Sequence, residues 1–509
     1  MFTRINSFGI NGIDAYKVEI ETDISGGLPA FDIVGLPDAS VRESRDRVRA
    51  AVKNCGFKFP VSRITVNLSP ADIRKVGSVY DLPILLSLLC AGGQLDADLS
   101  DAAFVGELAL NGEVKSVNGV LSMCASANEL GIKRFYVPRD NAAEAAAVCG
   151  DVQVYAVDTV NQLVRHLAKG EEMTRCVAEE YRENDIWDVA DFAEVKGQRM
   201  AKRAMEISAA GGHNVLLIGP PGSGKSMLAK RLPSILPQMT FEEMVETTKV
   251  YSVAGCLPKG SALVTRRPFR SPHHTVSSAG LSGGGAVPRP GEVSLAHNGV
   301  LFLDELPEFA PKSLETLRQP MEDGTITISR AQAAVQFPCS VTVVAAMNPC
   351  RCGYYGHPTK KCTCSAQSVS NYLSHISGPM VDRMDLHVEV PPVDFDALSS
   401  KSAEESSAQI RERVERARKI QSERYKETGI TCNARLTPAL MQKYCELTPT
   451  ASAMLKTAFD KMGMSGRAYD RILKVARTIA DLEGADLIDA PHIAQALQFR
   501  SLDRKYWQN

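Results

Sequence analysis

The first 168 residues alternate short runs rich in β-branched and aromatic residues with segments whose apolar residues recur at helical spacing. The strand-like runs are residues 16–20, 63–68, 134–137 and 152–157, and the helix-like segments include 39–55 and 82–90. Strands that alternate with helices in this way are typical of an α/β fold. The pattern therefore predicts an α/β domain over residues 1–168.

A charged segment follows this domain. The apolar periodicity is lost after Gly170, and acidic residues accumulate, namely Glu171, Glu172, Glu179, Glu180, Glu183, Asp185 and Asp188. A stretch without apolar periodicity offers no face that could pack into a core, so it is expected to connect domains. We place an acidic linker at residues 169–190.

Two further blocks follow the linker. Residues 191–395 again alternate apolar strands with helices, and they contain a Gly- and Ser-rich insertion at 271–291. From 396 to 509 the pattern is helical, because apolar residues recur at helical spacing in 410–426 and 468–482. The sequence thus predicts a multidomain α/β protein that ends in a helical lid.

The length and composition fit this organisation and exclude several classes of protein. A chain of 509 residues has room for about three domains. Its 58 Lys and Arg residues balance its 59 Asp and Glu residues, so the chain is neither histone-like nor a carrier of a polybasic tail. With 44% apolar and 23% charged residues, it lies away from the disordered and collagen-like extremes.

The sequence indicates a cytoplasmic location. The best apolar run, residues 82–93, is interrupted by Pro83 and Ser87 and is too short to cross a bilayer. The first ten residues contain Arg4 and lack the apolar core of a signal peptide. In a reducing cytosol the 13 cysteines are expected to be thiols or metal ligands rather than disulfides.

A phosphate-binding loop is predicted in the second block. The apolar strand at 215–218 and a following helical segment flank the residues Gly219, Pro220, Pro221, Gly222, Ser223, Gly224, Lys225 and Ser226. A Gly-rich loop between a strand and a helix is the context that marks a P-loop. Its backbone N–H groups cradle a polyphosphate, while Lys225 reaches the β and γ oxygens and Ser226 can bind Mg²⁺. ATP and Mg²⁺ are therefore the expected cofactors.

Two later strands end in residues that suit ATP hydrolysis. The apolar strand at 299–303 is followed by Asp304, expected in the Mg²⁺ shell, and by Glu305, expected to polarise the attacking water. The strand at 341–346 precedes Asn348, whose side chain could hold that water. Taken alone, each strand could be an ordinary core strand that ends in a polar loop. The P-loop upstream favours the catalytic interpretation.

The order of these motifs resembles AAA+ ATPases, in particular the clade that contains magnesium-chelatase ATPase subunits and MCM helicases. The residues that extend the resemblance lie in 378–385 and 465–468. It implies a parallel-sheet core with a helical lid, an arginine finger at Arg383 that acts on a neighbouring subunit's ATP, and a sensor-2 arginine at Arg467. Without the resemblance, either arginine would be a surface or ion-pair residue. A site completed by a neighbour implies a ring, and we expect a homohexamer.

Nearly the whole chain resembles the ComM/YifB family of bacterial magnesium-chelatase-like AAA+ proteins. The segments that carry this resemblance are residues 35–38, 67–72, 270–274 and 288–292, together with the cysteines that follow Asn348. The resemblance implies a motor that translocates on single-stranded, forked or branched DNA. It further implies helicase or branch-migration activity on recombination intermediates during natural transformation.

The amino-terminal domain resembles the Lon protease fold, whose activity uses a Ser-Lys dyad. In this chain Val79 occupies the position of the nucleophile and Leu121 that of the lysine. Ser78 and Lys115 lie nearby in the sequence, but a shift of one residue directs a side chain elsewhere. We therefore expect a non-catalytic, structural or DNA-guiding domain.

Two basic segments are candidates for DNA binding. Residues 325–330 alternate polar and apolar side chains and, with 335–337, predict a β-hairpin. In MCM-type helicases the corresponding hairpin enters the pore, which makes Arg330 a candidate contact to the DNA backbone. Arg266, Arg267 and Arg270 directly precede the Gly-rich insertion and could bind phosphates. The alternative for both segments is an ordinary solvated basic surface.

Four of the cysteines lie within 15 residues of one another. They are Cys350, Cys352, Cys362 and Cys364. Four soft ligands on two short arms can form a tetrahedral Zn²⁺ site, although arms of the form C-x-x-C are commoner. Free thiols or a redox pair are the alternatives. We expect a structural Zn²⁺ that braces the loop after Asn348.

The combined interpretation is a Mg²⁺-dependent ATPase that assembles into a ring and moves along DNA. The rivals are a chelatase-type ATPase that acts on a porphyrin-binding partner, a MoxR-like remodeller of proteins, and an ATP-dependent protease. The amino-terminal domain argues against the first two, and the replaced dyad at Val79 and Leu121 argues against the third.

Overall fold

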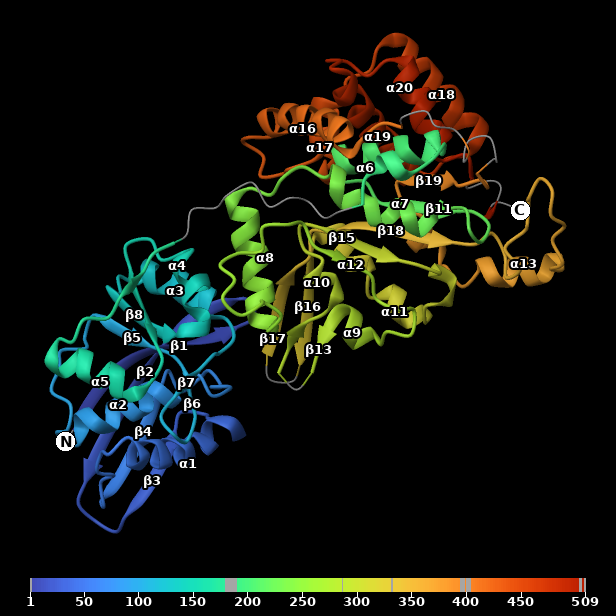
Figure 1. The fold of residues 1–509 in the computed structure, drawn as a ribbon. Coiled ribbons are helices and arrows are strands. Elements are labelled where there is room, and N and C mark those ends of the chain that lie inside the picture. The colour runs from blue at the N-terminus through green and yellow to red at the C-terminus, as the bar shows by residue number, and fades with distance from the viewer. Residues whose placement is uncertain are drawn as a thin grey trace. The chain divides into compact units, whose positions relative to one another are not determined.

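The computed structural model describes residues 2–178, 190–285, 287–330, 333–393, 399, 404–502 and 506–507. The chain forms two compact units, each shown in Figure 1. The first contains residues 1–184, 240–265 and 329–337, and the second contains 185–239, 266–328 and 338–509. Half of the predicted acidic linker at 169–190, residues 179–189, lies outside the described residues. The predicted domain boundaries stay predictions.

In the described part of the first unit, one mixed sheet has the strand order β10-β9-β8-β5-β1-β2-β4-β3. Its strands are β1 (Phe2–Asn11), β2 (Asp14–Ser25), β3 (Ala30–Val34), β4 (Arg63–Ser69), β5 (Ala102–Phe104), β8 (Arg134–Pro138), β9 (Gln153–Val157) and β10 (Arg175–Cys176). β1 pairs antiparallel with β2 along its whole length, whereas β5, β8 and β9 continue the sheet in parallel. Two short strands, β6 (Glu107–Leu108) and β7 (Val114–Lys115), form a separate ribbon.

Helices cover this sheet as the apolar pattern predicts. They are α1 (Ala39–Asn54), α2 (Asp81–Ala91), α3 (Val120–Glu129), α4 (Ala142–Ala146) and α5 (Val160–Lys169). Nearly every residue of α2 is buried, because α2 packs against β1 and β2 on one side and is covered by α1 on the other. The amphipathic α1 begins where the side chain of Asp38 accepts a hydrogen bond from the backbone N–H of Val41 at 2.8 Å. The predicted α/β fold of this region is confirmed.

The first unit also contains helix α8 (Phe241–Ala254), which lies in the sequence between the P-loop and strand β15 (Val300–Leu303). Ser252 of α8 donates to the buried carboxylate of Glu144 at 2.6 Å and accepts a hydrogen bond from the N–H of Gly119 at 3.1 Å. Asn141 also donates to Glu144, at 2.6 Å. Burial raises the pKa of the Glu144 carboxyl. These bonds attach α8 to the start of α3.

In the second unit a parallel sheet has the order β12-β15-β18-β11-β19. Its strands are β11 (Val215–Ile218), β12 (Phe269–Arg270), β15 (Val300–Leu303), β18 (Thr342–Met347) and β19 (Leu386–Glu389). All residues of β11, β15 and β18 are buried, as expected for parallel strands that are covered on both faces. The predicted parallel core is confirmed.

Helices and short ribbons surround this sheet. The helices before the lid are α6 (Arg199–Gly211), α7 (Lys225–Arg231), α9 (Ser278–Ser282), α10 (Glu292–Leu295), α11 (Pro311–Glu315), α12 (Arg318–Asp323), α13 (Ala366–Leu373) and α14 (Gly378–Val381). The Gly- and Ser-rich insertion carries α9 and the two-stranded ribbon of β13 (Gly283–Gly284) and β14 (Arg289–Pro290). The predicted hairpin is present as β16 (Thr325–Arg330) and β17 (Ala333–Pro338), and residues 329–337 of it are assigned to the first unit.

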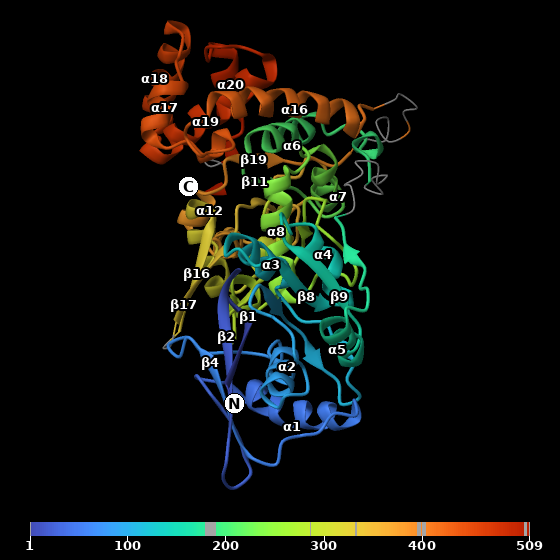
Figure 2. The same ribbon diagram turned by 90° about the vertical axis from the view of Figure 1, so that its left-hand side faces the viewer.

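The carboxyl-terminal helices form the predicted lid. They are α16 (Ser407–Arg424), α17 (Pro438–Tyr444), α18 (Pro449–Met462), α19 (Gly466–Glu483) and α20 (Ala490–Gln498). Figure 2 shows α16 alongside α6, against which it packs. The buried Asp481 of α19 receives hydrogen bonds from Arg424, Arg477 and Asn433 at 2.7–3.1 Å. Because the charges are paired, this lid can bury them.

Across the described ranges, none of the helices combines the length and the apolar character that crossing a membrane requires.

Candidate nucleotide site and cysteine cluster

Three polar loops meet at one edge of the parallel sheet. Strand β18 lies between β11 and β15, so the carboxyl ends of these three strands are adjacent. The P-loop follows β11, Asp304 and Glu305 follow β15, and Asn348 follows β18. The sheet order therefore brings together residues that lie as much as 123 positions apart in the sequence. Ligands of open α/β sheets bind at such edges.

The backbone of the P-loop depends on its glycines. Gly222 and Gly224 have φ angles of +76° and +91°, a region that other residues rarely adopt. A Cβ atom on Gly219 would lie 2.2 Å from the carbonyl oxygen of Val390, so this position has no room for a side chain. Gly224 precedes the first residue of α7, which directs the free N–H groups of that helix toward the loop.

Lys225 is held at the centre of the site. Its Nζ donates to the carbonyl oxygens of Gly219 and Pro220 at 2.8 and 2.9 Å and to Oδ1 of Asn348 at 3.1 Å. The side chain is buried, and burial lowers the pKa of the ammonium although Asp304 opposes this shift. Lys225 and Asn348, predicted from separate motifs, thus contact each other directly.

The residues predicted to bind Mg²⁺ also meet. Ser226 Oγ donates to Oδ2 of Asp304 at 2.7 Å. The other carboxylate oxygen of Asp304 accepts a hydrogen bond from the backbone N–H of Glu305 at 3.0 Å. A hydroxyl and a carboxylate are oxygen ligands of the kind Mg²⁺ prefers. These two side chains could hold the Mg²⁺ of a bound nucleotide.

Glu305 has an unusual backbone conformation and an unpredicted partner, His274. Its φ is +53°, which is rare for a residue other than glycine and often marks a functional site. Nδ1 of His274 lies 3.2 Å from Oε2 of Glu305, and the His274 ring contacts that of His273 in a tilted arrangement, with centroids 4.1 Å apart and an interplanar angle of 34°. The adjacent His273 and His274 were the available signal in the sequence, but a pair of neighbouring histidines alone does not predict a contact with Glu305.

Arg383 lies in the same unit as the site, but it already has partners. Its guanidinium forms an ion pair with Glu322 at 2.5 Å and donates to the carbonyl oxygen of Pro379 at 2.8 Å. The side chain of Arg383 is buried, whereas 51% of that of Glu322 is exposed. Action on a neighbouring subunit would require Arg383 to exchange this partner. Its role as an arginine finger stays a prediction.

Arg467 is exposed in the first turn of α19, after the helix cap formed by Ser465. One turn later, Arg471 forms an ion pair with the buried Asp385 at 2.7 Å. Burial opposes ionisation of Asp385, but Arg471 and His213 outweigh it and hold the pKa of this carboxyl below its usual range. This pair connects the lid to the residue that directly precedes β19. The sensor-2 role of Arg467 stays a prediction.

The arginines predicted to bind DNA are placed differently from one another. Arg270 forms a two-pronged ion pair with Glu292, both distances being 2.7 Å. Arg267 donates to backbone carbonyl oxygens of Pro237, Gln238 and Asn298 at 2.5–3.1 Å. Arg266 is exposed, and Arg330 ends β16 with a side chain outside the described part of the structure. The DNA-binding role of these arginines stays a prediction, and for Arg267 and Arg270 it requires an exchange of partners.

Both positions of the Lon-type dyad lie in the apolar core of the first unit. Val79 and Leu121 are buried. Their polar neighbours are bonded to different carboxylates, since Ser78 donates to Glu107 and Lys115 pairs with Glu113 at 2.6 Å. The structure therefore assigns Ser78 and Lys115 to two separate pairs rather than to one dyad.

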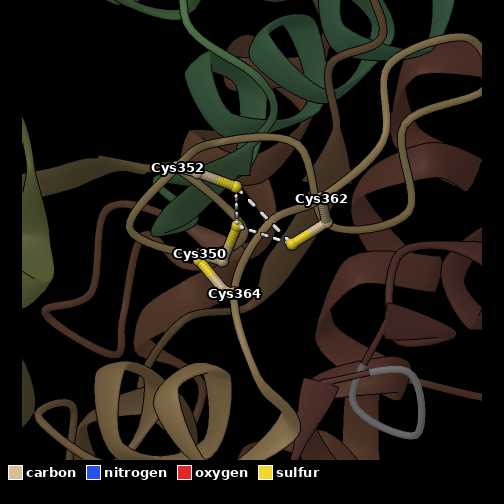
Figure 3. Close-up of side chains that lie close together, drawn as sticks. All are labelled: Cys350, Cys352, Cys362 and Cys364. Atoms are coloured by element: carbon tan, nitrogen blue, oxygen red, sulfur yellow. Dashed lines mark hydrogen bonds between the residues drawn. The ribbon is translucent and has the colours of Figure 1, made fainter.

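The four clustered cysteines converge on one point (Figure 3). All four sulfur atoms lie within 4.8 Å of one another, and the Sγ atoms of Cys350, Cys352 and Cys362 are 3.3–3.7 Å apart. In a tetrahedral site with Zn–S bonds of about 2.3 Å, neighbouring sulfur atoms are roughly 3.8 Å apart. The arrangement therefore fits a structural zinc ion.

Backbone groups around the cluster favour thiolates. Hydrogen bonds from the backbone of Tyr354 and Thr363 lower the pKa of the Cys352 thiol to about 5. Burial raises the pKa of Cys350 to about 12, although the backbone of Tyr355 and Tyr354 opposes this shift. Zinc binds the thiolate and can supply the charge that compensates for the burial of Cys350.

Comparison with known proteins identifies the family of each region. The family described as magnesium chelatase, subunit ChlI, matches residues 191–398. The model described as subunit ChlI of Mg-chelatase matches 20–141, and its C-terminal counterpart matches 404–500. The P-loop, strands β15 and β18 and the cysteine cluster all lie within the first of these matches.

Three individual relatives support this assignment. The chain is 44% identical over 499 residues to the competence protein ComM of Haemophilus influenzae. This match covers 97% of the present chain and 96% of ComM. It is 41% identical over 499 residues to the uncharacterized protein YifB of Escherichia coli, with the same coverage. A partial match, 27% identical over 154 residues, links 28% of the chain to 26% of Lon protease 2 of Bacillus subtilis. The chain therefore belongs to the ComM/YifB family of magnesium-chelatase-like AAA+ ATPases.

Proposed function

We propose that this protein is a ring-forming, Mg²⁺-dependent ATPase that moves along DNA and acts as a helicase or branch-migration motor in the recombination of incoming DNA. The observation that carries the proposal is the convergence of Lys225, Ser226, Asp304 and Asn348 at one edge of the parallel sheet. Such a motor would work in the cytoplasm.

The proposed roles in ATP hydrolysis follow from the positions of the side chains. The P-loop amides and Lys225 bind the phosphates, and Ser226 and Asp304 hold Mg²⁺. Glu305 polarises the attacking water, and Asn348 keeps that water near the γ-phosphate. Bound Mg²⁺ would neutralise the negative charge that develops on the phosphates.

The ring follows from the proposed action of Arg383. An arginine supplied by a neighbour stabilises the charge of the transition state, so that each site is complete only at an interface between subunits. A homohexamer is the assembly we propose. Arg467 would reach the nucleotide from the lid.

DNA is the proposed substrate because a relative with 44% identity is named a competence protein, and competence concerns the uptake of DNA. The hairpin that carries Arg330 and the segment that contains Arg266, Arg267 and Arg270 supply the basic groups for a phosphate backbone. A chelatase-type or MoxR-like ATPase would instead act on a protein or a porphyrin-binding partner.

The first prediction concerns stimulation by DNA. The ATPase rate of the full-length protein should rise when single-stranded or forked DNA is added, and this increase should fade as salt is raised, because salt competes with the phosphate contacts. Steady-state ATPase assays over a salt series measure the effect. A rate that ignores every form of DNA would favour the chelatase-type or MoxR-like alternative.

The second prediction concerns Glu305. Glu305→Gln should keep ATP affinity but lower kcat by about 100- to 10,000-fold, since the water loses the carboxylate that polarises it. Glu308→Gln is the matched control, because this carboxylate is also exposed and lies in the same turn three residues later, so its loss should leave kcat near wild type. Near-normal turnover by Glu305→Gln would reassign the catalytic base.

The third prediction concerns the interface between subunits. Arg383→Ala and Glu305→Gln should each be inactive alone, with a loss of about 1,000-fold or more for the finger, yet a mixture should regain partial activity. In mixed rings an intact Glu305 site is completed by the Arg383 of a Glu305→Gln neighbour. A mixture of Lys225→Ala with Glu305→Gln is the control, because both changes damage the same subunit's own site and no complete site can form. Equal inactivity of the two mixtures would eliminate the proposed finger.

We also propose that Cys350, Cys352, Cys362 and Cys364 bind one structural Zn²⁺ per chain, on the evidence of their sulfur geometry. The fourth prediction is that metal analysis of purified protein finds one zinc per chain and that Cys350→Ser loses it, because a hydroxyl replaces a thiolate ligand. The exposed Cys256, changed to Ser, is the control and should keep the zinc. Wild-type protein without metal would end the zinc proposal.

A further inference from the structure

The cysteine cluster lies in a segment that contacts the nucleotide site directly. Residues 348–365 connect β18 to α13 and contain no helix or strand. The segment begins with Asn348, which binds Lys225, and reaches its first cluster cysteine two residues later. The shape of such a segment depends on its local bonds rather than on a helix or a sheet.

A second contact joins the segment to the P-loop. Gly353 is buried against Pro221, and a Cβ atom at Gly353 would lie 2.4 Å from Cδ and 2.7 Å from Cγ of Pro221. The φ of Gly353 is +81°, so glycine suits this position for two separate reasons. The N–H of Gly353 donates to the carbonyl oxygen of Cys350 at 2.9 Å. The turn at residues 350–353, which contains Cys350 and Cys352, is thus the turn that contacts the P-loop.

A third contact comes from the far end of the segment. Helix α13 begins directly after the cluster, capped by Ser365. Burial raises the pKa of the hydroxyl of its buried Tyr372, and the nearby backbone of Asn348 opposes this shift. The helix that follows the cysteine segment therefore reaches back to Asn348, and Gly353 within the segment contacts Pro221.

From these contacts we propose that zinc bound at the cysteine cluster stabilises the nucleotide-binding form of the P-loop, so that metal occupancy regulates the affinity for ATP. The inference rests on the proposed zinc site and on the proposed ATPase. The metal fixes the turn at 350–353, the turn fixes Pro221 through Gly353, and the same segment fixes Asn348 beside Lys225.

Thermodynamics makes this coupling reciprocal. If zinc raises the affinity for ATP by some factor, ATP must raise the affinity for zinc by the same factor. Couplings between sites of one protein are typically about 5- to 150-fold. The two directions can be measured separately on the same full-length protein.

The experiment, the fifth prediction, compares zinc-loaded and zinc-stripped protein at constant Mg²⁺. Zinc is removed with the nitrogen chelator TPEN, and the affinity for the fluorescent nucleotide mant-ATP is measured before and after removal. We expect removal to weaken binding by at least about fivefold. In the reverse direction, the non-hydrolysable analogue AMP-PNP should protect the zinc from TPEN by the same factor. A thermal melt verifies that the stripped protein remains folded.

A variant that keeps all four cysteines tests the contact itself. Gly353→Ala should retain one zinc per chain but bind mant-ATP at least about fivefold more weakly, because its Cβ displaces Pro221. Gly429→Ala is the matched control, since Gly429 has a similar φ of +72° with nothing within 4 Å of its added Cβ. It carries the same backbone strain without the contact and should bind mant-ATP as wild type does.

The outcomes separate this inference from the proposals beneath it. Affinities for mant-ATP within twofold of one another for loaded, stripped and Gly353→Ala protein would overturn the regulatory role while leaving the zinc site intact. Wild-type protein that binds no zinc would overturn the metal site. Zinc-loaded protein that binds no mant-ATP would overturn the proposed ATPase itself.

Discussion

The central constraint on this protein is the adjacency of three parallel strands, β15, β18 and β11, whose carboxyl ends each deliver one polar loop. Their side chains are buried on both faces, so the order of the strands is fixed by the apolar core and not by the polar residues at their ends. The ammonium of Lys225 shows the consequence. It is buried, and it is satisfied only because the P-loop carbonyls and Asn348 converge on it from two of these strands.

The sequence predicted those parts of the structure whose cause is local. A strand, a glycine-rich loop and a helix follow one another within a few residues, so the P-loop was identifiable from residue types alone. Asp304 and Asn348 were identifiable because each ends an apolar run. The fold class and the lid helices were also predicted correctly, since burial on one face leaves a periodic trace in the sequence. The four cysteines were identified by their spacing, and the structure adds the convergence of their sulfur atoms.

The parts that escaped prediction depend on contacts between distant segments. The contact of His274 with Glu305 requires that β12 lie next to β15, and no local pattern in the sequence indicates this pairing of strands. The same holds for helix α8, which packs into the first unit through Ser252 and Glu144 although its neighbours in the sequence belong to the second. Gly353 appeared in the sequence only as a glycine between two cysteine arms. Its contact with Pro221 exists because the two loops leave neighbouring strands, β18 and β11.

The arginines illustrate a more general limit, because the sequence gives their charge but not the partner that holds it. Three of these arginines have partners within the chain. Arg267 donates to backbone carbonyl oxygens, and Arg270 pairs with Glu292. Arg383 pairs with Glu322 and donates to the carbonyl oxygen of Pro379. A buried guanidinium without a partner raises the free energy of the folded protein. An arginine that acts on another molecule therefore still needs an acceptor within its own chain before it meets that molecule. The pair of Arg383 and Glu322 is asymmetric in this respect, since the arginine is buried and half of the glutamate is exposed. The exposed carboxylate can be solvated when the pair separates, which lowers the cost of an exchange in which Arg383 turns to a phosphate instead. The present partner of Arg383 is therefore compatible with a role in trans.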